Sequence, residues 1–188
     1  MLEKLPEFVG EALKGVRPGL EKTVYAQIEA PETLKVESAA FSDGGDIPVR
    51  FTQDGEGRSF PLAFSGVPEH SGAVAVIVED ADSPTPWPIV HVLAYDEPGR
   101  DADWPEGALR SPGHEGAGHA LGHNSFLKNE YLPPDPPPGH GPHRYVVQVF
   151  ALKHACGFDK TPGKADVLEA LQRGVLTKGR LTGVYERG

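Results

Sequence analysis

Apolar and polar positions alternate along much of this chain, which is the pattern of β-strands. Alternation or an unbroken apolar run, rich in β-branched and aromatic residues, marks five segments: residues 22–30, 33–41, 72–80, 88–96 and 143–152. The 23 glycines and 19 prolines are spread along the chain, which indicates many turns between short elements. The pattern therefore predicts a mainly β core with long loops.

Two other segments, residues 2–16 and 164–179, have the spacing of amphipathic helices. We expect each helix to pack on the sheet, with a homodimer contact as the alternative for the first. The apolar stripe of the first is Leu2, Leu5, Val9, Ala12, Leu13 and Val16, and that of the second is Leu168, Leu171 and Val175.

Between residues 96 and 142 no periodicity persists, and glycine, proline, histidine and aspartate are frequent. A loop of this length inside a compact domain is uncommon and is usually functional. The chain contains no internal repeat and no linker. We therefore expect one domain over residues 1–188, with residues 1–20 as an N-terminal helical extension.

The charge excludes several classes of partner. The chain has 18 basic and 27 acidic residues, a net charge of −9, which is the wrong sign for nucleic acid or an anionic membrane surface. Cys156 is the only cysteine, so neither an intramolecular disulfide nor a cysteine-based metal cluster can form. The N-terminal residues do not resemble a secretory signal, and no apolar run approaches the roughly 20 residues that cross a bilayer. We expect a cytoplasmic protein without integral membrane association.

Asp80 continues an apolar row to the end of its predicted strand. The two-residue period puts it on the same face as Val76 and Val78, and Asp82 follows in phase. A buried charge is costly unless it is paired. These carboxylates are therefore either exposed turn residues or part of a site.

Three more polar residues occupy positions in predicted strands. His91 is the polar member of an apolar row over residues 89–95, where a histidine is more often a satisfied core residue than a ligand. His143 and Tyr145 point the same way on the strand that they begin. If the three strands adjoin, these residues and Asp80 form one small pocket, with two imidazoles and a phenol as donors for an oxyanion.

The ordered set of motifs resembles the phosphatidylethanolamine-binding protein family, also called the Raf kinase inhibitor protein-like family, in its bacterial branch. Its first signature, Asp-Pro-Asp-x-Pro followed by a histidine on the next strand, is matched by "DADSP" and His91. Its second is matched by "YLPPDPPPGHGPHRYVVQVFAL", residues 131–152. The resemblance covers about residues 28–187 and leaves out the N-terminal helix.

This resemblance implies a sandwich of two packed antiparallel sheets with peripheral N- and C-terminal helices. It also implies a small pocket for phosphate or a phosphorylated headgroup, in which Asp80 keeps a histidine positioned and protonated. Ala81 and Pro133 depart from the family pattern, which has proline and glycine there, and both lie at the mouth of the pocket. By position, the ligand-binding residues are Asp80, Asp82, Pro84, His91, Pro134, His143 and Tyr145.

Enzyme motifs are weak by comparison. His114, His119 and His123, with Glu115, are residue types that zinc accepts, but the glycines between them disfavour a helix and the HExxH order is absent. We therefore expect no metal site, and a mobile polar loop at the rim of the pocket. A GxSxG motif and a phosphate-binding loop followed by lysine are also absent.

The leading hypothesis is a non-catalytic binding protein for a phosphate-bearing ligand, without a cofactor. The ligand is a phospholipid headgroup, a nucleotide or a phosphorylated side chain, and the protein regulates a kinase or protease partner. The alternative is a small hydrolase or lyase that uses His91 and His143 as acid and base.

Overall fold

The computed structural model describes residues 6–187. Short 3₁₀ turns at Leu20–Lys22 and Val49–Phe51 accompany the regular elements. These elements are, in chain order, α1 (Glu7–Leu13), α2 (Val24–Gln27), β1 (Lys35–Glu37), β2 (Gly45–Asp46), β3 (Leu62–Ser65), β4 (Ala73–Asp80), β5 (Ile89–Pro98), β6 (Ala102–Trp104), β7 (His143–Leu152), α3 (Lys164–Gly174) and β8 (Val175–Tyr185).

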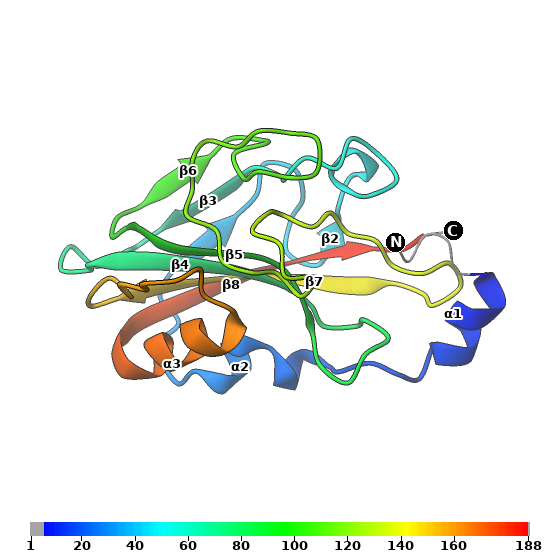
Figure 1. Cartoon of the computed structure of the whole chain (residues 1–188), viewed down its shortest axis with the longest axis horizontal. Coiled ribbons are helices and arrows are strands. Elements are labelled where there is room, and N and C mark those ends of the chain that lie inside the picture. The colour runs from blue at the N-terminus through cyan, green and yellow to red at the C-terminus, as the bar shows by residue number, and fades with distance from the viewer. Residues whose placement is uncertain (1–5, 188) are drawn as a thin grey trace.

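The strands form two stacked sheets, as the family resemblance implied (Figure 1). The five-stranded sheet has the order β2-β8-β7-β4-β5, and the three-stranded sheet, β1-β3-β6, covers one of its faces. Helices α2 and α3 cover the other face. The strand pairs are antiparallel, except that β2 runs parallel to β8. None of the helices among residues 6–187 is long and apolar enough to cross a membrane.

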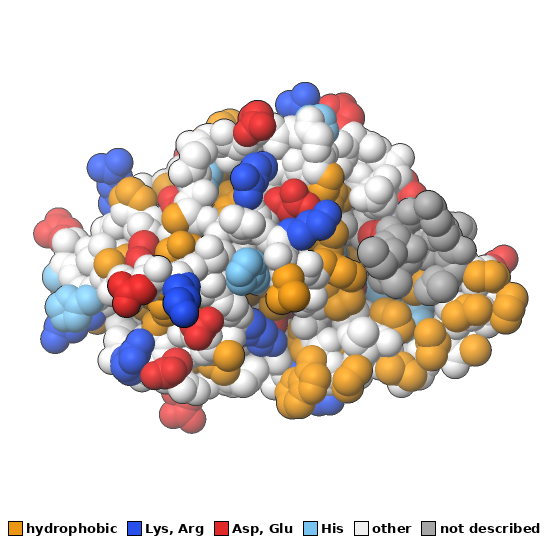
Figure 2. All heavy atoms as spheres, viewed as in Figure 1, with side chains coloured by type: hydrophobic (Ala, Val, Ile, Leu, Met, Phe, Trp, Pro, Cys, Tyr) orange, Lys and Arg blue, Asp and Glu red, His pale blue; other side chains and the backbone are white. Residues whose placement is uncertain are grey.

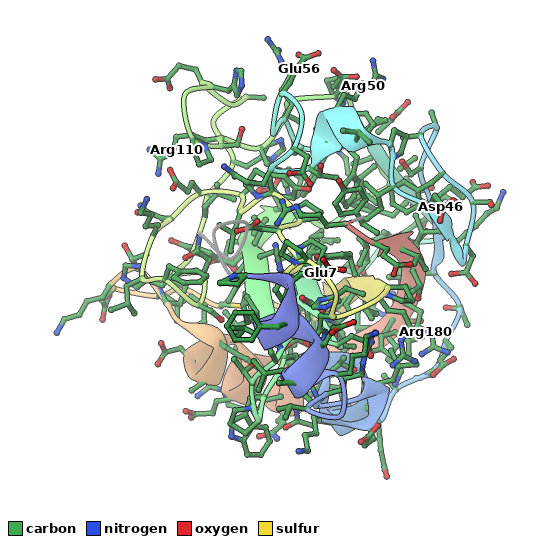
Figure 3. The ribbon with its side chains drawn as sticks, turned by 90° about the vertical axis from the view of Figure 1, so that its right-hand side faces the viewer. Glu7, Asp46, Arg50, Glu56, Arg110 and Arg180 are labelled. Carbon is green, nitrogen blue, oxygen red and sulfur yellow. The ribbon has the colours of Figure 1, made fainter. Side chains whose placement is uncertain are left out.

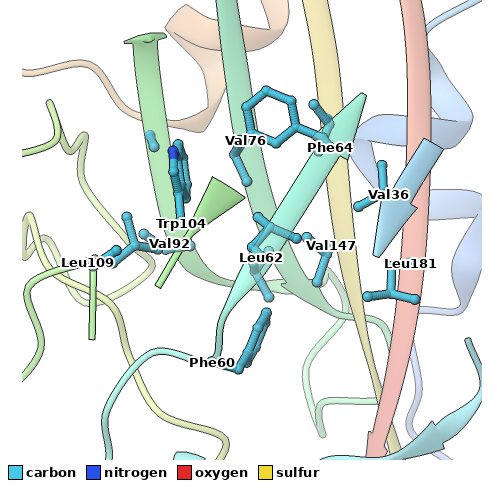
Figure 4. Packing of buried hydrophobic residues seen from close by; sticks show 14 of the residues in the cluster. Val36, Phe60, Leu62, Phe64, Val76, Val92, Trp104, Leu109, Val147 and Leu181 are labelled. Atoms are coloured by element: carbon cyan, nitrogen blue, oxygen red, sulfur yellow. The ribbon is translucent and has the colours of Figure 1, made fainter. Parts of the chain in front are cut away.

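The core between the sheets joins aromatic rings to branched side chains. Phe64 and Trp104 belong to the three-stranded sheet and face residues such as Val76 of the larger sheet (Figure 4). A second apolar cluster lies between the larger sheet and the helices. Because β4 and β7 are buried on both faces, their sequences are almost continuously apolar, and the strands predicted at 72–80 and 143–152 are confirmed.

The other predicted strands are confirmed only in part. β5 begins one residue later and ends two residues later than the predicted segment 88–96. Segment 33–41 is a strand only at β1. Residues 96–142 all lie within the described part of the chain, and apart from the end of β5 they contain only one element, β6. The prediction of a long irregular loop is therefore largely correct.

Residues 22–30, predicted as a strand, form the end of a 3₁₀ turn and α2. The N–H of Val24 donates to Glu79 Oε2 at 2.7 Å, and the N–H of Tyr25 donates to Gln148 Oε1 at 2.6 Å. These buried side chains of the sheet satisfy the free N–H groups at the start of the helix. Both partners are distant in the sequence, so the local pattern did not reveal the helix.

The helix predicted over 164–179 ends at Gly174, and Val175 begins β8 instead of completing a helical stripe. Glycines obscure the alternation of β8. At Gly183 a Cβ atom would lie 2.6 Å from Ile47 Cγ1, so the close crossing of another segment excludes a side chain there. The peripheral C-terminal helix that the resemblance implied is present as α3 and is followed by β8.

Helix α1 packs on a loop, so the expectation that it packs on the sheet is wrong. Leu2 and Leu5 of the predicted stripe lie outside the described residues. The buried residue of α1 is Gly10, where a Cβ atom would lie 1.9 Å from Pro138 O. Phe8 is 70% exposed, and apolar side chains gather at this end of the molecule (Figure 2). Helix α1 is therefore held by close contact of its backbone at Gly10 with the loop at Pro138, and not by burial of its apolar stripe.

Candidate functional site

A cavity of about 220 Å³ lies where β4 ends and β5 begins. The end of the molecule that carries α1 faces the viewer in Figure 3, where Glu7 is labelled. Asp80 and His91 are buried in the cavity wall, whereas Phe126 is 39% exposed at its mouth. The lining residues are Gln53, Asp80, Ile89, His91, Pro112, Phe126, Lys128, Leu132 and Asp135.

The structure brings together the four residues of the predicted pocket. Asp80 is the register partner of Tyr145, and Asp80 Oδ2 lies 2.8 Å from His143 Nδ1. The rings of His91 and Tyr145 pack edge to face with centroids 5.1 Å apart. The predicted convergence of three strands is therefore present, while the role of these residues in ligand binding stays a prediction.

A β-bulge places His91. Val78 of β4 pairs with Val92 and Glu79 pairs with Val90, so His91 is the extra residue on β5. The predicted row over residues 89–95 is wrong, because the bulge breaks its two-residue period. Leu93 and Tyr95 belong to the helix-covered cluster, whereas His91 packs against Tyr145.

His91 is an acceptor toward the cavity. Its Nδ1 lies 2.7 Å from Leu132 O, and because a carbonyl only accepts, Nδ1 carries the proton. Burial lowers the pKa of His91, so the ring is neutral and Nε2 holds a lone pair. Nε2 is buried without a hydrogen-bond partner among residues 6–187. In this form the imidazole accepts toward the cavity instead of donating, and its role in ligand binding stays a prediction.

Tyr145 is not among the residues that line the cavity, but its ring packs on His91 and its hydroxyl is a donor. Burial, reinforced by the Asp80 carboxylate, raises the pKa of Tyr145 well above its usual value, so the phenol keeps its proton. Its hydroxyl oxygen is buried and makes no hydrogen bond of acceptable geometry within the described chain, although the N–H of Asp135 lies near it. An acceptor on His91 and a donor on Tyr145 thus belong to two rings that pack against each other.

His143 does not line the cavity, and both of its ring nitrogens are engaged. Nδ1 lies 2.8 Å from Asp80 Oδ2, and Nε2 lies 2.7 Å from Nδ1 of His140. His140 Nε2 in turn donates to Leu13 O at 2.9 Å. Neither ring nitrogen of His143 is free to grip a ligand in this structure, and its direct role in ligand binding stays a prediction. The sequence analysis did not select His140, although its spacing from His143 in "HGPH" was a visible signal.

Asp82 is buried but is also absent from the cavity lining. It accepts hydrogen bonds from Arg144 N, Nε and Nη2 at 2.7–2.9 Å, and Arg17 Nη1 lies 3.2 Å away. Pro84 and Pro134 are not lining residues either; the O of Pro134 accepts the N–H of Gln53. Pro112, Phe126 and Leu132 line the cavity in their place.

Asp82 is expected to make the protein sensitive to acid. Burial would raise its pKa, but the hydrogen bonds from Arg144 and Arg17 outweigh burial and lower the pKa from 3.8 to about 2. Because the folded pKa is depressed, the stabilisation is present above pH 4 and is lost as the pH falls from about 4 to 2, by up to about 2 kcal/mol. Thermal unfolding should show the wild type and Asp82→Asn converging over this range. A difference that stays constant with pH would contradict this role.

Arg187 and Asp135 are further residues that sequence reasoning missed. Arg187 Nη1 donates to Asp135 Oδ1 at 2.9 Å and to Pro136 O at 2.7 Å, and its Nη2 binds Asp54. The segment after β8 thereby fixes the proline-rich segment that carries Asp135 into the cavity wall. No local signal in the sequence links residues so far apart.

The histidines of the long loop serve separate contacts. His119 Nδ1 lies 2.9 Å from Glu97 Oε2, and His114 Nε2 lies 2.9 Å from Glu56 O. His123 lines a different hollow, beside Trp87. Across residues 6–187 no group of three or more histidine, cysteine or carboxylate side chains is placed to hold a metal ion.

Comparison with known proteins gives consistent matches. A family model described as phosphatidylethanolamine-binding protein matches residues 37–186. A UPF0098 protein of Methanothermobacter thermautotrophicus is 35% identical over 159 residues, covering 82% of this chain and 100% of that protein. A solved phosphatidylethanolamine-binding protein homologue of Chlamydia trachomatis matches with a TM-score of 0.74 at 30% identity, covering 82% of this chain and 98% of that one. E. coli YbcL matches with a TM-score of 0.74 at 28% identity, covering 82% and 99%.

Proposed function

Because this chain belongs to the phosphatidylethanolamine-binding protein family, we propose that it is a non-catalytic binding protein whose cavity takes the phosphate group of a small ligand. The observation that carries the proposal is the pair of buried, unpartnered atoms, His91 Nε2 and the Tyr145 hydroxyl. A buried polar group without a hydrogen bond costs about 1–3 kcal/mol, so a ligand that pairs both atoms recovers much of that cost.

The ligand must bring a proton of its own. His91 Nε2 accepts, and the neighbouring carboxylates of Asp80 and Asp135 add negative charge. A phosphate monoanion fits, because its P–OH donates to His91 while another oxygen accepts from Tyr145. A dianion lacks that donor and meets the carboxylates with more charge. Lys128 lies at the cavity wall and offers a cation.

The rest of the cavity suits an organic substituent. Ile89, Pro112, Phe126 and Leu132 give it an apolar lining near the mouth. A phospholipid headgroup, a nucleotide and a phosphorylated side chain all present a phosphate on such a substituent. The last of these would connect the protein to a kinase or protease partner, as an extension of this proposal.

The hydrolase or lyase alternative finds no support in the geometry. Acid–base chemistry by His91 and His143 needs both rings to reach the ligand. His143 has both nitrogens bonded within the protein and is absent from the cavity lining. Release of phosphate or methanol from methyl phosphate, lost in His91→Ala, would restore this alternative and overturn the binding-only proposal.

Methyl phosphate and dimethyl phosphate, titrated by calorimetry or NMR, test the proposal. Methyl phosphate is expected to bind most tightly below pH 6 and to weaken by about tenfold per pH unit above it, as the monoanion loses its proton. Dimethyl phosphate has no P–OH and is expected to bind at least about tenfold more weakly at pH 5.5. Equal binding of the two esters would show that His91 donates, and no binding of either would refute the phosphate pocket.

The variant Tyr145→Phe tests the donor and is part of the same experiment. We expect it to weaken methyl phosphate binding by about 5–100-fold, since it removes one hydrogen bond to an anion, while leaving the ligand-free protein as stable as the wild type or more so. The matched control is Tyr131→Phe, which removes a buried hydroxyl whose own hydrogen bond goes to Phe51 O. That variant should bind methyl phosphate normally.

A further inference from the structure

A buried relay of three hydrogen bonds joins the cavity to the N-terminal segment. It runs from Asp80 Oδ2 to His143 Nδ1 at 2.8 Å, from His143 Nε2 to His140 Nδ1 at 2.7 Å, and from His140 Nε2 to Leu13 O at 2.9 Å. Asp80 is 3% exposed and both rings are fully buried. Leu13 ends α1, which precedes the residues that the family model matches.

The number of protons in the relay follows from its ends. Leu13 offers a carbonyl, which only accepts, so His140 Nε2 carries a proton. His140 Nδ1 then accepts if its ring is neutral, and His143 Nε2 donates to it. Burial, together with the nearby charge of His143, lowers the pKa of His140, which supports the neutral ring. Three hydrogen bonds need three protons, and two neutral rings supply two. The Asp80 carboxyl and the His143 ring share the third proton.

Loss of the third proton reverses the relay. The Asp80 carboxylate then requires the proton on Nδ1 of His143, which leaves Nε2 with a lone pair. His140 must donate to that lone pair through Nδ1, so its own Nε2 loses the proton. A lone pair on His140 Nε2 would then face Leu13 O at 2.9 Å, two acceptors in contact. Deprotonation beside the cavity thereby breaks the attachment of α1.

We propose that docking of the N-terminal segment, residues 6–17, is coupled through His140 to the protonation of the Asp80–His143 pair. The docked segment favours the form of the relay that holds this third proton. Docking therefore weakens when the relay loses it. His140 acts here as a positioning residue that links two parts of the protein.

Other contacts hold the segment without changing protonation near neutral pH. Arg17 donates to His140 O and Pro142 O, each at 2.7 Å, and pairs with Asp82. His91 and Tyr145 keep their neutral forms, because burial lowers the pKa of the first and raises that of the second. The charged and titratable groups that surround the relay are Glu7, Glu11, Arg17, Asp82, His91, Tyr131, Asp135, Arg144, Tyr145 and Glu186.

Long-range ¹H–¹⁵N NMR of the full chain, without ligand, tests the proposal between pH 5.5 and 8.5. These spectra identify which nitrogen of each histidine carries the proton. His140 is expected to change from the Nε2–H to the Nδ1–H form as the pH rises, and the amide signals of Gly10 and Gly15 should move toward released values at the same midpoint. A His140 ring that keeps one form while the Gly10 signal titrates would overturn the proposal, and so would a relay that never changes while α1 is released.

Three variants separate coupling from simple packing. His140→Gln keeps a donor toward Leu13 but cannot change form, so α1 should stay docked over the whole pH range. Arg17→Met should weaken docking at every pH and leave the change in His140 in place. His119→Gln, which alters a histidine paired with Glu97, should change neither. Release of α1 from His140→Gln at the wild-type midpoint would refute the coupling. If His140→Gln does not fold, the wild-type and Arg17→Met spectra decide.

Discussion

Replacing Glu79 with alanine is expected to lower the free energy of unfolding by about 3–5 kcal/mol. Glu79 is fully buried, and its Oε2 accepts from Val24 N at 2.7 Å and from Gln148 Nε2 at 2.9 Å. Its other oxygen pairs with the ammonium group of Lys164. One carboxylate therefore joins α2, β7 and α3 to β4, and alanine would leave a cation and two donors without their partner. Urea unfolding measures the loss.

The matched control for Glu79→Ala is Glu169→Ala on α3. Glu169 pairs with Arg173 one turn away, with both side chains more than half exposed. An exposed pair of this kind contributes about 0.5 kcal/mol or less. A loss below about 1.5 kcal/mol in Glu79→Ala would mean that water replaces the carboxylate, because an unreplaced buried partner costs more than this.

Asp80→Ala is expected to destabilise the protein by about 3 kcal/mol. The change removes the acceptor of His143 Nδ1 and also the oxygen that accepts the N–H of Asp82 at 2.9 Å. Asp80→Asn retains an acceptor for one of these donors and should lose about half as much. Exposed Asp103 on β6 provides the control, and its alanine variant should differ from the wild type by no more than about 0.5 kcal/mol. Equal stability of Asp80→Ala and Asp103→Ala in urea would contradict the structural role of this carboxylate.

The period of two residues located the central strands and one side of the site. It put Tyr145 and His143 on one face of β7 and Asp80 at the end of β4, because these strands are regular and buried on both sides. The resemblance supplied their adjacency, which no local pattern contains. The same period predicted the wrong neighbours for His91, because the bulge there adds one residue to β5. The residue types around His91 do not reveal this bulge.

The remaining members of the site come from contacts between distant segments. His140 belongs to a loop that α1 covers, and Asp135 is fixed by Arg187, which follows the last strand. Hydrogen-bond direction was equally hidden, since the acceptor role of His91 depends on the carbonyl of Leu132, 41 residues away. Sequence reasoning therefore predicted which residues meet more successfully than it predicted what each one donates or accepts.

The bulge at His91 gives β5 an extra residue relative to β4. At this position β5 can either pair regularly with β4 or place His91 in the cavity wall, but not both. A chain shortened by one position at His91 could pair residues 89–94 of β5 in phase with β4, at the expense of the ring that packs on Tyr145, while the second register shift, between Val74 and Val76 of β4, would remain. Such a chain would keep the two stacked sheets and have a more regular pairing of β5 with β4. It would lack the bulge that places His91 in the cavity wall. Selection for regular sheet pairing alone would thus erase this cavity.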